Sequence, residues 1–173
     1  MQEATPTRNL AFHRTSKAAA SMIIREGILT MKTQGFGLAD GRKDPQQYEQ
    51  DRAALIARGF SFGIPALTDI QNGPYGHREM IPSTLRQMWH AMNITESTFI
   101  RVGSVSLHWD ENGETIAVDL DALEATGVTI MGDSYGDNES KEVRGDIPSS
   151  CVVGIVSDEW MRANGYTVES HAY

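Results

Sequence analysis

The sequence of 173 residues contains a single cysteine and no long hydrophobic run. One cysteine excludes a disulfide framework, and the apolar run around Cys151 predicts that it is a small buried side chain. The longest apolar segments, residues 151–153 and 154–156, are far shorter than the roughly 20 residues needed to cross a bilayer. The first eight residues also lack the basic and apolar regions of a secretory signal. These absences predict a cytoplasmic protein that does not cross a membrane.

Positive charge is scarce, with 15 Lys and Arg against 23 Asp and Glu, which gives a net charge of −8. This excess would repel a phosphate backbone, so nucleic acid is not an expected partner. The common phosphate-loop, dinucleotide-fingerprint and H-E-x-x-H zinc motifs are also missing. The histidines are scattered without metal-ligand spacing: His13, His77, His90, His108 and His171. Catalysis by a bound metal is therefore not expected.

The rest of the composition, 40% hydrophobic and 22% charged, is ordinary for a globular protein. A chain of this length is able to bury one sizeable core without disulfides or metals. We expect a single domain over residues 1–173, with a flexible leader at 1–8 and a frayed tail at 166–173. The composition leaves the oligomeric state open.

Two helices are predicted near the N-terminus. A short strand over residues 9–13 should lead into a helix at 17–26, N-capped by Thr15 or Ser16. Gly27 is well placed to end that helix. A second helix should begin after residue 44 and end at Gly59. Its start carries an N-cap acceptor, a proline and a capping-box glutamine: Asp44, Pro45 and Gln47.

The strand signals lie mainly in the second half. A third helix after Pro82 presents an apolar stripe made of Leu85, Met88, Trp89 and Met92. Beyond it, segments 99–109 and 114–119 flank Asn112-Gly113, a pattern that favours a β-hairpin. Further elements are expected as a short helix at 122–125, strands at 128–131, 142–144 and 150–156, and a helix at 158–163. This order predicts an α+β fold, with N-terminal helices packed on a largely antiparallel sheet.

One segment matches a hydrolase pattern. Residues 132–136 fit G-x-S-x-G after an apolar strand, and Ser134, then Asp146 or Asp158, then His171 follow the order of an α/β-hydrolase triad. The segment after Ser134 lacks the apolar stripe of the helix that must follow such a nucleophile. A glycine-rich turn is therefore favoured, and a serine hydrolase stays an alternative.

Two other segments resemble ADP-ribosyltransferases of the small single-domain toxin or effector type. Residues 12–16, Phe-His-Arg-Thr-Ser, precede an Ala-rich helix and Gly27-Ile28, much like the family's opening His-x-Thr/Ser strand. Residues 142–148, Glu-Val-Arg-Gly-Asp-Ile-Pro, and the apolar segment 152–155 resemble its late Glu-Val strand and closing strand. Together these segments cover about a quarter of the chain. The resemblance implies an ADP-ribosyltransferase-like fold.

The resemblance also implies NAD as co-substrate and ADP-ribose transfer to a macromolecule. His13 would hold the NAD ribose and the nicotinamide amide, with Arg14, Thr15 and Ser16 as neighbouring cofactor contacts. Glu142 would be the catalytic carboxylate, able to stabilise the oxocarbenium character that develops when the nicotinamide bond breaks. The side chains of His13 and Glu142 should then line one cleft, and the transferase hypothesis fails if they face opposite surfaces of the sheet.

The sequence departs from the family in its middle region. Relatives carry an aromatic residue there that stacks on nicotinamide, and Tyr75 or Phe62 are the candidates here. The loop over residues 132–140, with Tyr135 and Glu139, would select the acceptor, which we expect to be a protein. Ser140 stands where many relatives that modify proteins have Gln or Glu. RNA phosphotransferases share the scaffold, but the acidic chain favours them less.

A function without catalysis is the remaining alternative. An acidic domain of this size suits an inhibitor, an antitoxin-like partner or a viral accessory protein. Such a protein would present one exposed apolar patch rather than a cleft.

Overall fold

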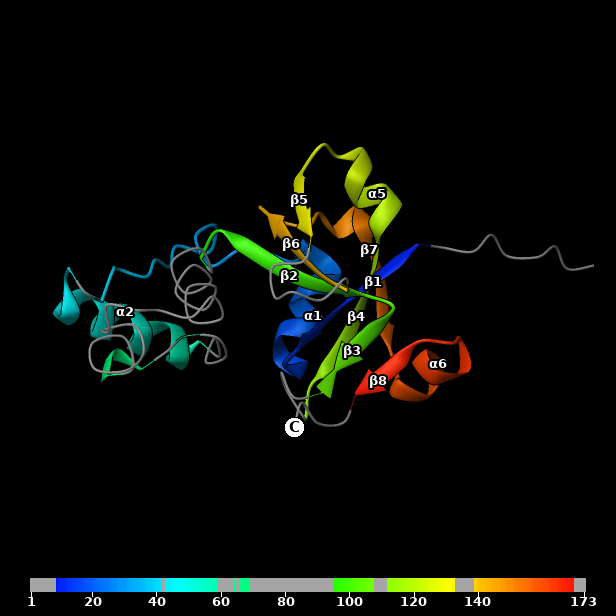
Figure 1. The fold of residues 1–173 in the computed structure, drawn as a ribbon, viewed down its shortest axis with the longest axis horizontal. Coiled ribbons are helices and arrows are strands. Elements are labelled where there is room, and N and C mark those ends of the chain that lie inside the picture. Colours follow the sequence, from blue (N-terminus) through cyan, green and yellow to red (C-terminus); the bar gives the residue numbers. More distant parts are fainter. Residues whose placement is uncertain are drawn as a thin grey trace, which may run out of the picture.

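The computed structural model of the chain describes residues 9–41, 43–58, 64, 66–68, 95–107, 112–132 and 139–169. The elements are, in order, β1 Leu10–Thr15, α1 Lys17–Glu26, α2 Pro45–Ala57, β2 Ser97–Val102, β3 Ser104–Ser106, β4 Glu114–Asp119, α5 Leu120–Ala125, β5 Thr129–Gly132, β6 Ser140–Arg144, η3 Ser149–Cys151, β7 Val152–Val156, α6 Asp158–Ala163 and β8 Thr167–Glu169. Figure 1 shows the strands gathered at the centre of the molecule, with α2 beyond the start of β2.

Six strands form the main sheet in the order β5-β6-β2-β1-β4-β7, and every neighbouring pair is antiparallel. A second sheet has two strands, β3 and β8, which run parallel. The predicted α+β class with a largely antiparallel sheet is therefore confirmed. The strands β6, β2 and β1 are adjacent, so they bring together segments from the two ends of the chain.

The two faces of the main sheet are covered by different elements. Ala11 is in register with Val118, and both belong to the apolar cluster under α1 and α5. The next pair, Phe12 and Ala117, belongs to a cluster with Met161 of α6 and residues of β3 and β8. This alternation follows from the period of two in a strand. Helices α1 and α5 thus cover one face, and α6 with the small sheet covers the other.

The first helix forms as its capping residues predict. The hydroxyl oxygen of Ser16 accepts a hydrogen bond from the backbone N–H of Ala19 at 3.2 Å. Gly27 ends the helix with φ 84°, and its N–H donates to the carbonyl of Ile23 at 2.8 Å. A Cβ on Gly27 would lie 2.2 Å from the carbonyl oxygen of Ile147. Only glycine fits this close approach to the segment after β6.

The second helix also begins where its N-cap predicts. The Asp44 side chain accepts from the N–H of Gln47 at 3.1 Å, and Arg58 is the C-cap. Tyr48 and Leu55 are buried in a cluster with Met31 and Ile64, which ties α2 to the segment that follows α1. The predicted end at Gly59 and the predicted helix after Pro82 lie outside the described residues.

The hairpin prediction is wrong. Strand β4 pairs with β1 and β7, and the segment before it divides into β2 and β3. Gly103, with φ 82°, separates these two strands, and β3 continues away from the main sheet to pair with β8. The alternating pattern identified the strands, but it carries no information about their partners.

The tail is more ordered than expected. Residues 167–169 form β8, and the ring of Tyr166 packs edge-on against Phe12 with centroids 4.8 Å apart. The prediction of a frayed tail is therefore wrong for residues 166–169, because an aromatic anchor and a strand partner hold them. Residues 170–173 and the expected leader at 1–8 lie outside the described part. Among the described helices, none has the length and apolar character that crossing a membrane requires.

Candidate functional site

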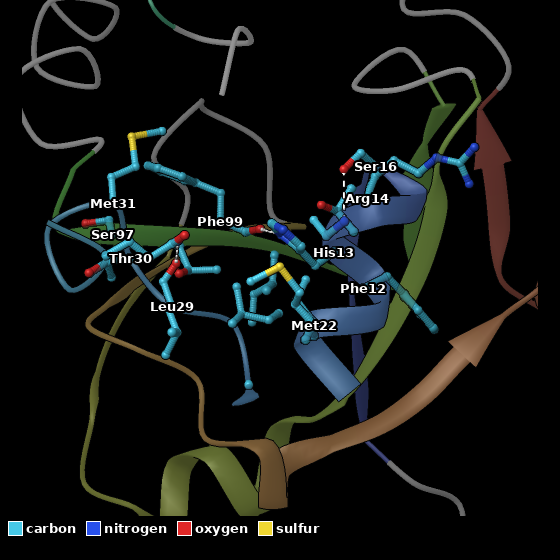
Figure 2. Close-up of a pocket in the computed structure, with 18 of the residues that line it drawn as sticks. Phe12, His13, Arg14, Ser16, Met22, Leu29, Thr30, Met31, Ser97 and Phe99 are labelled. Atoms are coloured by element: carbon cyan, nitrogen blue, oxygen red, sulfur yellow. Dashed lines mark hydrogen bonds between the residues drawn. The ribbon is translucent and has the colours of Figure 1, made fainter. Parts of the chain in front are cut away.

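A cavity of about 370 Å³ lies where β1 and β2 separate, walled by α1 and the segment that follows it. Its lining includes the consecutive residues 12–16 of β1 and its end, and the consecutive residues 97–101 of β2. A pocket above one face of a sheet would contact alternate residues of each strand. Consecutive lining residues therefore place this cavity at the edges of the two strands, in the opening between them. Figure 2 shows His13 and Phe99 near its middle, with Ser97, Thr30 and Met31 at one end.

The opening begins at His13. Strands β1 and β2 are in register only at Ala11 with Val102 and Phe12 with Arg101. One residue further along β1, the ring nitrogen Nδ1 of His13 lies 2.9 Å from the carbonyl oxygen of Phe99. A side chain thus satisfies the β2 carbonyl at the point where the strands diverge. A side-chain hydrogen bond thus stands where a backbone hydrogen bond between the two strands would be expected, and the strands are further apart beyond this point.

The bond to Phe99 determines the chemistry of the His13 ring. A carbonyl oxygen only accepts, so Nδ1 carries the proton and donates it. Burial lowers the pKa of His13 below its usual 6.5, and the bond to Phe99 opposes this effect without reversing it. The ring is therefore neutral at neutral pH, and Nε2 is left as a hydrogen-bond acceptor. Such a nitrogen is suited to accept a bond from a ligand hydroxyl.

Glu142 is fully buried on β6, and its carboxylate is only partly satisfied. The hydroxyl of Ser97 donates to Oε1 at 2.7 Å, and Nε of Arg144 lies 4.0 Å from the same oxygen. The other oxygen, Oε2, has no hydrogen-bond partner among the described residues. Burying a polar atom without a partner costs about 1 to 3 kcal/mol, so native proteins rarely retain one without a reason. This orphaned oxygen marks Glu142 as a functional candidate.

The prediction that the side chains of His13 and Glu142 line one cleft is wrong for Glu142, and the two side chains face opposite sides of the sheet. This geometry counts against the transferase hypothesis. His13 is in register with Ile116, which faces α1, whereas Glu142 is in register with Phe99 and points to the other face. Glu142 is not among the lining residues, but Ser97 is, and its hydroxyl contacts the carboxylate. Because the cavity passes between the strands, it is bounded by both faces. The carboxylate thus stands one side chain behind the wall.

The residues that follow His13 line the cavity, and two of them also make contacts within the protein. Arg14, Thr15 and Ser16 all line the cavity. However, the Arg14 guanidinium donates to the Thr115 hydroxyl at 3.0 Å and lies 3.7 Å from the Asp158 carboxylate. The Ser16 oxygen caps α1, which leaves only its hydrogen for a ligand. The Arg14 side chain is therefore committed to joining β1, β4 and α6.

Apolar side chains form part of the cavity wall. Phe99, Met22 and Met31 contribute to the wall around the polar groups (Figure 2). The aromatic candidates from the sequence, Tyr75 and Phe62, lie outside the described residues. Phe99 is an aromatic residue of the cavity wall, and its sequence pattern predicts only a strand of a hairpin. Phe99 lies two residues after Ser97 on β2, so the period of two in a strand places both side chains on the same face.

The wall after α1 is held in place by the segment that follows β6. Oδ1 of Asp146 accepts from the N–H of Thr30 at 2.7 Å, and Oδ2 accepts from the hydroxyl of Thr33 at 3.0 Å. Ile28 and Ile147 form an antiparallel bridge beside these bonds. Asp146 therefore positions the wall, which leaves it a poor acid for a hydrolase triad.

The other members of that triad receive no support from the described residues. Ser134 and His171 lie outside them, and Asp158 is close to Arg14. The serine hydrolase therefore stays a prediction without a geometry to support it.

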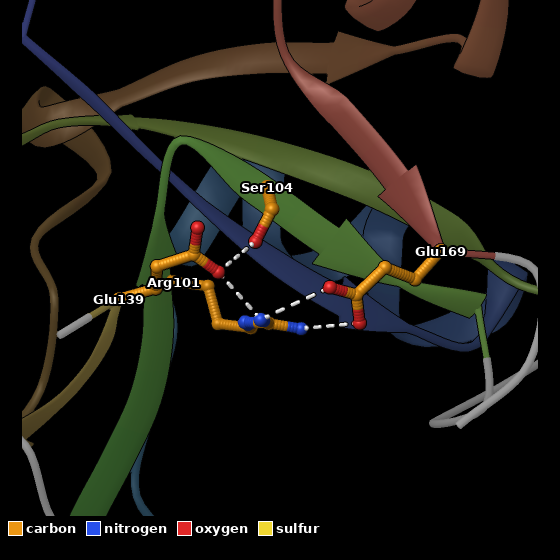
Figure 3. A network of polar contacts seen from close by, with 4 residues as sticks. All are labelled: Arg101, Ser104, Glu139 and Glu169. Atoms are coloured by element: carbon orange, nitrogen blue, oxygen red, sulfur yellow. Dashed lines mark hydrogen bonds and ion pairs between the residues drawn. The ribbon is translucent and has the colours of Figure 1, made fainter. Parts of the chain in front are cut away.

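Glu139 belongs to a network of polar contacts that includes neither His13 nor Glu142 (Figure 3). Its Oε2 accepts from Arg101 at 2.6 Å and from the Ser104 hydroxyl at 2.8 Å, and Arg101 also donates to Glu169 at 3.1 Å. Burial lowers the pKa of Arg101, but the bonds to Glu169 and Glu139 outweigh burial and raise it above the usual value. The Glu139 carboxylate thus joins the residue that precedes β6 to β2, β3 and β8. Tyr135 lies outside the described residues.

In the described part of the chain, no cluster of three or more His, Cys, Asp or Glu side chains is arranged to hold a metal ion. Fold and site together define an α+β protein with an antiparallel sheet that is opened between two central strands by a ligand-sized cavity. The chain matches no known family model, and no curated protein matches its sequence significantly.

Proposed function

We propose that this protein is an NAD-dependent ADP-ribosyltransferase, which cleaves the bond between nicotinamide and ribose and transfers ADP-ribose to a protein acceptor. The observation that carries the proposal is the opening between β1 and β2, which has His13 on one strand and Ser97 on the other. Ser97 connects this opening to the buried carboxylate of Glu142 on β6. The sequence resemblance pointed to His13 and Glu142 independently of their positions in space.

His13 supports binding of a ribose. Its neutral ring offers Nε2 as an acceptor, and the bond from Nδ1 to Phe99 fixes the tautomer and the ring plane. Ribose hydroxyls are donors that such a nitrogen accepts. The apolar wall at Phe99 and Met22 is suited to a flat nicotinamide ring next to this ribose.

Glu142 supports cleavage through its charge. As the nicotinamide bond breaks, positive charge develops on the ribose, and a nearby carboxylate stabilises it. Two opposite charges about 5 Å apart at an effective dielectric constant of about 20 attract by about 3 kcal/mol. Ser97 lines the cavity and its hydroxyl donates to Oε1, so the Glu142 carboxylate would act on the substrate through its charge from behind this side chain.

The acceptor follows from charge. A net charge of −8 disfavours an RNA acceptor, so a protein is the better match. The buried free thiol of Cys151 is compatible with a reducing cytoplasm, which we propose as the site of action.

The direct test is incubation of the purified chain with NAD labelled in its adenine, with and without a cell extract. Nicotinamide release and transfer of label to protein are both measured. Release of nicotinamide with label on a discrete protein supports the transferase, and release without transfer limits the activity to hydrolysis. An intact NAD pool after prolonged incubation, in the presence of extract, would overturn the proposal.

A binding function without catalysis has one observation in its favour. Strand β7 lies at the edge of the main sheet, and two of its apolar side chains, Val153 and Ile155, are 43% and 46% exposed. An edge strand of this kind offers unpaired backbone groups to another chain. Retention of a tight partner by wild type, lost in Ile155→Lys, together with no cleavage of NAD, would favour this alternative.

A further inference from the structure

The cavity has an unequal distribution of positive charge. Three arginines line it within the described residues: Arg14, Arg58 and Arg101. Arg14 is held by Thr115 and Asp158, and Arg101 by Glu139 and Glu169. Arg58 has no ion pair with a described carboxylate. A cation strengthens phosphate binding, and among the lining arginines of the described residues Arg58 is the one whose guanidinium is not paired with a described carboxylate.

Arg58 is oriented by an aromatic ring. It is the exposed C-cap residue of α2, and its guanidinium carbon lies 5.2 Å from the centroid of the Phe36 ring. A guanidinium stacked on a ring has its face covered, while its N–H groups project from the edge and remain available. Those donors match the oxygens of a phosphate.

Both sides of this contact are fixed to the cavity wall. The N–H of Phe36 donates to the carbonyl of Met31 at 2.8 Å, and Met31 lines the cavity. Tyr48 and Leu55 of α2 are buried in the same cluster as Met31. The Arg58–Phe36 contact therefore has a defined position relative to the cavity.

We propose that Arg58, stacked on Phe36, is a phosphate-binding subsite of this cavity that takes the diphosphate of a nucleotide. The proposal rests on the proposed function for the identity of its natural ligand, the diphosphate of NAD, but the subsite itself is testable without catalysis. ADP carries the diphosphate and lacks the reactive nicotinamide bond. Adenosine lacks both.

The test is calorimetric titration of the full chain with ADP and with adenosine. Three variants are compared with wild type: Arg58→Gln, Phe36→Leu and, as a matched control, Arg25→Gln. Arg25 is an exposed arginine of α1 that is not among the lining residues. Circular dichroism checks that each variant is folded.

We expect Arg58→Gln to weaken ADP binding roughly tenfold to hundredfold, the range for a hydrogen bond between charged groups. Phe36→Leu should weaken it less, because the charge remains but its orientation is lost. Adenosine binding should not change with Arg58→Gln, and Arg25→Gln should bind ADP as wild type does. Higher salt should weaken ADP binding to wild type more than to Arg58→Gln.

The results separate the subsite from the proposed function. Binding of ADP that depends on Arg58, in a protein that leaves NAD intact, would support the subsite and reject the transferase. If wild type does not bind ADP, or if Arg58→Gln binds it as tightly as wild type, the subsite is overturned even where NAD is cleaved. Equal weakening by Arg25→Gln would also reject it, because the effect would then come from overall charge.

Discussion

Replacement of Glu142 by glutamine tests whether its charge serves catalysis. The side chain is fully buried, Oε1 accepts from Ser97, and Oε2 has no partner among the described residues. Glutamine keeps the shape and the oxygen that bonds Ser97, while it removes the charge. An attraction of about 3 kcal/mol for a charge about 5 Å away would be lost, so nicotinamide release should fall by roughly a hundredfold.

Stability should respond in the opposite direction. A buried carboxylate with one unpaired oxygen costs folding free energy, and a neutral amide costs less. We therefore expect the melting temperature of Glu142→Gln to equal or exceed that of wild type. A lower rate of nicotinamide release together with an unchanged or higher Tm is the pattern of a residue that is retained for function at the expense of stability.

The assay follows nicotinamide release at saturating NAD for wild type, Glu142→Gln and Glu139→Gln, with Tm measured by circular dichroism. Glu139 is a neighbouring glutamate that bonds Arg101 and Ser104, so its replacement controls for a general loss of negative charge. We expect Glu139→Gln to release nicotinamide at nearly the wild-type rate. A folded Glu142→Gln protein that releases nicotinamide as fast as wild type would refute the reasoning, as would an equal loss in both variants.

Three further predictions concern His13, Gly27 and Tyr135. The lowered pKa of His13 should keep kcat/KM for NAD constant down to pH 6.5, with a fall only at lower pH as the folded ring is protonated, and His13→Gln should remove that acid limb. Because the folded ring has the lower pKa, the unfolded chain binds the proton first as the pH falls below 6.5. The contribution of His13 to the free energy of unfolding is therefore full above pH 6.5 and declines below it. Urea unfolding at pH 5 and pH 7 measures this difference in the free energy of unfolding. Gly27→Ala should cost more than about 2 kcal/mol in urea unfolding, because its Cβ would collide with Ile147, whereas Gly103→Ala, with a similar φ and open space, should cost about 1 to 2 kcal/mol. Tyr135→Ala should change which protein receives ADP-ribose more than it changes nicotinamide release, and an equal loss of both would argue against a target-selecting loop.

The helices were predictable because their signals are local. Ser16 and Gly27 bound α1, and the Asp44 cap starts α2 within the same few residues that the sequence indicates. The last helix, α6, spans residues 158–163 as expected, with Ser157 as its N-cap. Each of these elements depends on contacts between residues three or four apart, which the sequence displays directly.

Strand partners were not predictable because they depend on distant segments. The pattern around Asn112 indicates two strands, but β4 finds its neighbours in β1 and β7. β8 was missed altogether, since three residues near the end of the chain carry no period of their own. Its order comes from β3 and from the packing of Tyr166 on Phe12, at a sequence separation that no local pattern encodes.

The site depends on a feature that no residue pattern describes, the early divergence of β1 from β2. His13 and Glu142 were identified through a sequence resemblance. Three lining residues were not predicted, because they come together only in the folded chain, where β1 and β2 separate and the end of α2 reaches the cavity: Ser97, Phe99 and Arg58. The divergence coincides with His13, whose ring bonds the Phe99 carbonyl at the point where the register of β1 and β2 ends. One histidine thus lies where the sheet opens and lines the opening. Its replacement should therefore alter the shape of the cavity as well as its chemistry.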